Sequence, residues 1–133
     1  VGGPADPESG LGVSIPLHAS AMGKVLVAWN PDFDVADLGE LPALTPRTIT
    51  DPRRLRAELE RVRERGYALN DEEQALGKRT VAVPLADEYG QVQMALALRA
   101  DTEGLPLERV PELAEIGREY ALVFQRVLLR PAR

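Results

Sequence analysis

The residues with the clearest potential for chemistry are three cations beside a predicted β-hairpin, namely Lys78, Arg79 and Arg99. By alternation along the strands, Arg99 shares one face of the hairpin with Thr80 and Ala97. A guanidinium beside small side chains suits a hollow that accepts an anion, because it can hold a carboxylate through two parallel hydrogen bonds. The other interpretation, in which Arg99 only ends an exposed strand, stays open.

The segment around Pro16 predicts a helix over residues 16–29, because apolar residues recur there at helical spacing. Its first amides, near Ala21 and Met22, would lack partners and carry the positive end of the helix dipole. Small side chains at this point let a ligand approach the backbone. Carboxylates favour such positions, so this helix start is a second candidate for binding an acid.

Two other groups of residues invite a catalytic interpretation. His18 and Ser20 could act as base and nucleophile, but they lie two residues apart and no oriented carboxylate accompanies them. We expect capping or buried hydrogen bonding from them, with a small hydrolase using His18 as a less favoured alternative. The acidic run Asp71-Glu72-Glu73 lacks a second acidic cluster, so we expect it to cap and solvate a turn, with one of its members in a salt bridge. We therefore predict no catalytic residue, no metal site and no cofactor.

Composition excludes several classes of function. The 133 residues include no Cys and one His, which removes disulfides, cysteine metal sites and two-histidine metal motifs. Lys and Arg number 16 against 21 Asp and Glu, a formal charge of −5 that is poorly suited to coating a nucleic acid. The apolar stretches are too short to span a bilayer. We expect a cytoplasmic protein that makes no contact with a membrane.

The order of the predicted elements indicates an α+β domain with one twisted antiparallel sheet and flanking helices. The clearest helix covers residues 52–65, with Asp51 as N-cap, Pro52 in the first position and Gly66 as the left-handed stop. A short helical turn is predicted at residues 32–38, and a long amphipathic helix at residues 110–128. Three strands are predicted at residues 67–70, 80–85 and 91–99. Three strands are few, so we expect the first strands of the sheet to be lacking. Residues 1–14 are predicted to be a loop or a partial edge segment.

The two faces of the predicted hairpin differ in the size of their side chains. The bulky set is Val81, Val83, Leu85, Val92, Met94, Leu96 and Leu98. The small set is Thr80, Ala82, Ala95 and Ala97. We expect the bulky face to build the core and the small face to leave room.

Four segments follow one another in a distinctive order: Pro16-Leu17-His18-Ala19-Ser20-Ala21-Met22-Gly23-Lys24, Thr45-Pro46-Arg47-Thr48-Ile49-Thr50, Arg65-Gly66-Tyr67-Ala68-Leu69-Asn70-Asp71-Glu72-Glu73 and Gly77-Lys78-Arg79-Thr80-Val81-Ala82-Val83-Pro84. In combination they resemble the GAF-like effector-binding domain of the IclR family of bacterial transcriptional regulators. The resemblance runs from Ser14 to Leu128 and implies an effector-binding domain over residues 15–129. It implies a sensor of small organic or aromatic acids rather than an enzyme. It also implies a homodimer or homotetramer that reaches DNA only through an N-terminal winged helix-turn-helix missing from this chain.

Carried over by motif position, the ligand pocket of the family would be formed by Ala21, Met22, Asn70, Thr80, Ala97 and Arg99. Acid-sensing members have Asp in place of Asn70, Cys or Ser in place of Thr80, and Ser-x-Ser in place of residues 97–99. A methyl group and a guanidinium in place of two hydroxyls predict an effector that is larger or more strongly anionic than a simple keto acid. The alternative is a ligand-free oligomerisation module, whose pocket would be packed shut by its own side chains.

Overall fold

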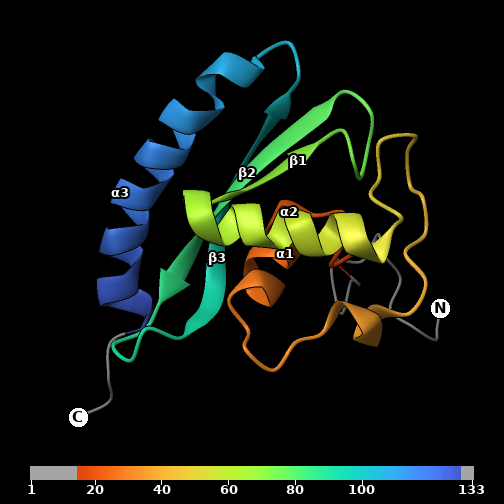
Figure 1. The fold of residues 1–133 in the computed structure, drawn as a ribbon. Coiled ribbons are helices and arrows are strands. Elements are labelled where there is room, and N and C mark those ends of the chain that lie inside the picture. The colour runs from red at the N-terminus through yellow and green to blue at the C-terminus, as the bar shows by residue number, and fades with distance from the viewer. Residues whose placement is uncertain (1–14, 130–133) are drawn as a thin grey trace, which may run out of the picture.

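A computed structural model describes residues 15–129 of the chain, which form an antiparallel sheet with helices on both faces (Figure 1). The described elements are α1 (Ala21–Ala28), the 3₁₀ turn η1 (Val35–Leu38), α2 (Pro52–Arg65), β1 (Ala68–Asp71), β2 (Lys78–Ala86), β3 (Val92–Asp101), the 3₁₀ turn η2 (Leu107–Arg109) and α3 (Val110–Leu128). The three strands pair in the order β1-β2-β3. The predicted α+β class with flanking helices is confirmed, whereas the loop predicted for residues 1–14 lies outside the described residues.

Local signals define α2 as predicted. Asp51 caps the helix by accepting a hydrogen bond from the Arg53 amide at 2.9 Å, and Pro52 occupies the first position. Gly66 ends the helix with φ of 86°, a conformation that costs glycine little because it has no Cβ.

The first helix is shorter than predicted, because it begins at Ala21 instead of Pro16. The amides of Ala19 and Ser20 both bond to the Pro16 carbonyl and form a turn before the helix. The Ser20 side chain then accepts a hydrogen bond from the Gly23 amide at 3.0 Å and acts as the N-cap. This correction matters because it makes Ala21 and Met22 the first two residues of α1.

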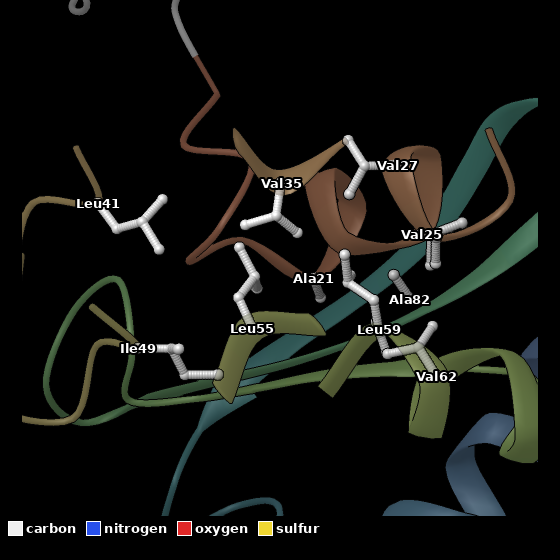
Figure 2. Packing of buried hydrophobic residues seen from close by; sticks show 12 residues of the cluster. Ala21, Val25, Val27, Val35, Leu41, Ile49, Leu55, Leu59, Val62 and Ala82 are labelled. Carbon is white, nitrogen blue, oxygen red and sulfur yellow. The ribbon is translucent and has the colours of Figure 1, made fainter. Parts of the chain in front are cut away.

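Both faces of the sheet carry core packing, so the prediction that the bulky face alone builds the core is wrong. The larger apolar cluster lies on that face, where Ala82 meets side chains from α1 and α2. Figure 2 shows Val25 from α1 with Leu55, Leu59 and Val62 from α2 in this cluster. Small strand residues allow this packing because they let a helix backbone come close to the sheet.

The bulky face packs against α3. A Cβ added to Gly117 of α3 would lie 3.5 Å from the methyl groups of Val83. Val92 was predicted on this face but packs with the α1 cluster instead. The cause is a register shift between Leu85 and Ala86, after which Ala86 pairs with Val92. The outer side of α3 leaves Leu122, Val123, Phe124 and Val127 exposed. Within residues 15–129, none of the helices is both long and apolar enough to cross a membrane.

Candidate functional site

A row of three polar residues crosses the sheet on the side that faces α1. Asn70 of β1 pairs with Thr80 of β2, and Thr80 pairs with Arg99 of β3. Directly paired residues in neighbouring strands project to the same face, so the three side chains share one surface. The start of α1 lies over this surface.

These elements enclose a pocket with a cavity volume of about 240 Å³. All six residues predicted from the sequence line it: Ala21, Met22, Asn70, Thr80, Ala97 and Arg99. Ile15, Ser20 and Gln74 complete the lining, and the sequence had not singled them out for this role. The structure therefore brings the predicted residues together, while their part in binding a ligand stays a prediction.

The start of α1 contributes Ala21 and Met22 to the pocket lining. The capping hydroxyl of Ser20 occupies the Gly23 amide, and the Lys24 amide bonds to the Ser20 carbonyl. Among the described residues, the amides of Ala21 and Met22 have no hydrogen-bond partner. Unsatisfied amides at a helix start attract anions, because the helix dipole adds positive potential there.

Asn70 is held so that it can offer the pocket a donor only. Its side chain is 5% exposed, and its Oδ1 accepts hydrogen bonds from the amides of Glu73 at 2.9 Å and Gln74 at 3.3 Å. The Nδ2 group has no partner among the described residues, although the side chain lines the pocket. The backbone turn after β1 therefore fixes the orientation of the Asn70 amide and leaves Nδ2 as its unpaired end within residues 15–129.

Two of the three predicted cations are neutralised elsewhere. Lys78 pairs with Asp101, and this contact lowers the pKa of the Asp101 carboxyl through a hydrogen bond and its charge. Arg79 is buried on the opposite face of the sheet, where it binds Asp71 at 2.8 Å and the Leu105 carbonyl at 2.6 Å. Arg99 is exposed at the pocket and makes no ion pair within residues 15–129.

A fully buried charge lies close to the pocket and was not predicted from the sequence. Lys24 of α1 is 0% exposed and donates to Glu58 of α2 at 3.0 Å and to the Leu69 carbonyl of β1 at 2.9 Å. Its Nζ also lies 2.7 Å from Oε1 of Glu73. The signal was present, because Lys24 is the only charged residue in the otherwise apolar α1.

The two buried carboxylates titrate in opposite directions. Burial acts to raise the pKa of Glu58, but Lys24, Arg65 and Arg61 outweigh it and lower that pKa. For Glu73, burial prevails over the attraction of Lys24 and raises the pKa. Glu73 is the less well satisfied of the two, since its Oε1 is near Lys24 without hydrogen-bond geometry.

The acidic run and His18 have structural partners. All three acids from Asp71 to Glu73 form ion pairs, so the prediction of a mainly solvated turn is wrong for the buried Glu73. His18 is 5% exposed and donates from Nε2 to the Pro42 carbonyl at 2.8 Å, which matches the expected buried hydrogen bond. Over residues 15–129, no cluster of three potential metal ligands is present.

Comparison with known proteins defines the class to which this fold and pocket belong. The family described as bacterial transcriptional regulator IclR C-terminal matches residues 6–125. The chain belongs to this family and corresponds to its C-terminal, effector-binding part.

Individual relatives agree with this assignment. The chain is 35% identical to the HTH-type transcriptional regulator XynR of Escherichia coli K12, covering 93% of this chain and 50% of XynR. The crystal structure of the Thermotoga maritima IclR superposes with a TM-score of 0.76 at 33% identity, covering 84% of this chain and 47% of that protein. The inducer-binding domain of PobR from Acinetobacter, solved as a double mutant with 3-hydroxybenzoic acid, gives a TM-score of 0.77 at 30% identity, covering 86% and 67%. The chain thus spans about half the length of the curated relatives it matches.

Proposed function

We propose that this domain senses a small organic or aromatic carboxylate and transmits binding to a separate DNA-binding domain of a transcriptional regulator. The ligand would lie between the start of α1 and the row formed by Asn70, Thr80 and Arg99. In this proposal the domain is cytoplasmic, forms a homodimer or homotetramer, and contacts neither membrane nor DNA directly.

The observation that carries the proposal is the excess of donors around the pocket. Two helix amides, the Asn70 Nδ2 group and the Arg99 guanidinium have no partner among the described residues, and the lining contains no Asp or Glu. Donors left unpaired after removal from water cost free energy, and a carboxylate satisfies several of them at once. The name of the PobR structure supports the same class of ligand, because it pairs that domain with an aromatic acid.

The two alternative functions predict different features. A ligand-free oligomerisation module predicts a pocket filled by its own side chains, whereas an open volume of about 240 Å³ is present here. A hydrolase using His18 needs an accessible imidazole, whereas His18 is buried and donates to a backbone carbonyl. Neither feature favours a second function.

The effect of an effector on the regulator is limited by its differential affinity for two conformations of the protein. Lys24 connects the pocket to the rest of the domain, because it joins α1 to α2 and to Glu73 in the turn after β1, whose amide holds Asn70. A ligand that moves α1 would therefore also change the distances from Lys24 to Glu58 and Glu73.

A thermal-shift screen of the 133-residue chain against small carboxylic acids tests the proposal. A ligand that binds only the folded form raises the midpoint, and the shift grows with concentration. Each acid is compared with its own amide, for example 3-hydroxybenzoate with 3-hydroxybenzamide. We expect shifts from acids but not from their amides.

The location of binding is tested by Ala97→Leu, which fills the pocket from β3. The variant should keep a cooperative transition without ligand and lose the acid-dependent shift. If every acid leaves the wild-type midpoint unchanged, the proposed sensing function is wrong. If the Ala97→Leu variant folds and still responds fully, the ligand binds somewhere other than this pocket.

A further inference from the structure

We infer that the preferred ligand is a dicarboxylate, with one carboxylate on the α1 amides and the second on Arg99. This inference rests on the proposed function and adds the number of charges that the ligand carries. It also assigns Arg99 as the residue that distinguishes a dicarboxylate from a monocarboxylate of the same length.

The first step is the size of the pocket. The sequence predicted an effector that is either larger or more strongly anionic than a simple keto acid. A cavity of about 240 Å³ lies below the usual range of about 300–1,000 Å³ for sites that hold drug-sized molecules. The volume therefore favours additional charge over additional bulk.

The second step is the charge balance around the pocket. Two acids of this part of the fold have lysine partners, because Glu73 lies against Lys24 and Asp101 pairs with Lys78, although the charge of Arg99 also helps to lower the pKa of Asp101. At the far end of the polar row stands Asn70, a neutral amide that cannot compensate a guanidinium. Arg99 thus leaves one positive charge without an ion pair within the described part of the chain.

The third step is the separation of the two anchors. Neighbouring strands lie about 4.8 Å apart, so Asn70 of β1 and Arg99 of β3 are separated by about 10 Å across the sheet. The α1 amides and the Asn70 Nδ2 group form one donor group, and the Arg99 guanidinium forms another. A short dicarboxylate presents two anionic groups at opposite ends, whereas a monocarboxylate leaves one donor group unpaired.

The buried position of Asn70 strengthens the assignment of the first donor group. Its side chain is only 5% exposed, and its oxygen is committed to the amides of Glu73 and Gln74. The remaining Nδ2 group lines the pocket without a partner among the described residues. A donor that is held in one orientation at the lining of an open pocket suits an acceptor placed in that pocket.

Arg99 also borders a second hollow, of about 300 Å³, between β3 and α3. Apolar side chains such as Leu105 and Leu113 provide much of that lining. A small, doubly charged ligand would leave this apolar surface unmatched. The polar row on the α1 side is therefore the better site for a dicarboxylate.

The test compares matched acids by titration calorimetry with the 133-residue chain. Glutarate and adipate are each paired with the monocarboxylate of the same carbon number, pentanoate and hexanoate. We expect at least one dicarboxylate to bind about tenfold or more tightly than its partner, as a charge-assisted pair provides. In Arg99→Gln this preference should disappear, because binding of the dicarboxylate should weaken far more than binding of its monocarboxylate partner.

Two further variants separate charge from structure. Arg126→Gln removes an exposed arginine from α3, on the other side of the sheet, and should leave the preference intact. Arg99→Lys keeps the positive charge but lacks the planar guanidinium, so this variant should retain part of the preference for dicarboxylates.

Each outcome has a distinct meaning. Equal binding of monocarboxylates and dicarboxylates by the wild type would overturn the dicarboxylate inference and leave the sensing function standing. The inference also fails if Arg99→Gln weakens both classes equally or changes neither. Failure of every acid to bind the wild type would overturn the proposed function itself.

Discussion

Replacement of Lys24 by Met should lower the free energy of unfolding by about 3–5 kcal/mol at neutral pH. Met has a similar length and no charge, so the change removes the buried cation while filling much of its space. Both Glu58 and Glu73 then lose the partner that lies within 3.0 Å of them.

The structure indicates which carboxylate causes the loss. Glu58 keeps Arg61 at 3.2 Å and Arg65 at 3.4 Å, so its charge stays compensated. Glu73 keeps only the Asp71 amide, at 3.3 Å from its Oε2. An unpaired buried carboxylate is the costly species, and the penalty therefore falls on Glu73.

Urea denaturation followed by fluorescence of Trp29, the single tryptophan, measures the effect. In thermal unfolding, a loss of this size should lower the midpoint by roughly 10–20 °C for a domain of this length. The double variant Lys24→Met/Glu73→Gln should recover about 2 kcal/mol or more, because it removes the charge left unpaired.

Lys78→Met is the matched control, because Lys78 is the only other lysine and its pair with Asp101 is exposed. This variant should leave the urea midpoint nearly unchanged. A loss below about 1 kcal/mol in Lys24→Met, or a double variant no more stable than the single one, would refute the reasoning.

Two other substitutions test the charge and packing around α1. In the folded protein burial raises the pKa of Glu73 above its ordinary value of 4.5, so stability should fall as the pH rises from 4.5 through the folded pKa. Glu73→Gln should remove that fall in urea titrations at stepped pH, and an unchanged slope would contradict the assignment. Gly23→Ala should cost about 1–2 kcal/mol despite the better helix propensity of Ala, because the added Cβ would lie 2.6 Å from Ser20 Oγ and 2.7 Å from Leu17 Cα. A Gly23→Ala variant as stable as the wild type in urea would show that this turn can relax.

The elements that could be predicted from the sequence are those determined by local chemistry. The bounds of α2 follow from Asp51, Pro52 and Gly66, which act within a few residues of themselves. The pocket residues could also be predicted from the sequence. Strand alternation places Thr80, Ala97 and Arg99 on one face, and the family resemblance indicates the same positions. No local rule revealed that α1 begins only at Ala21, since helical spacing of apolar residues continues backwards into the turn.

The parts that could not be predicted depend on contacts between distant residues. Lys24 lies 34 residues from Glu58 and 49 from Glu73, as their sequence numbers show. The apolar surroundings of Lys24 in the sequence indicate that it is buried, but they do not identify the carboxylates that pair with it. The register shift that moves Val92 to the α1 face depends on how two strands align. Both features arise from tertiary packing, to which composition and periodicity are insensitive.

The buried lysine and the pocket are parts of one arrangement, since α1 contributes to both. Its first two residues line the pocket, and one turn later Lys24 reaches the carboxylate of Glu73. The amide of Glu73 in turn helps to fix the Asn70 side chain, which also lines the pocket. A change that weakens the contact between Lys24 and Glu73 should therefore loosen both the start of α1 and Asn70, and it should reduce the affinity for the proposed ligand as well as stability, because the donors would have to be ordered on binding.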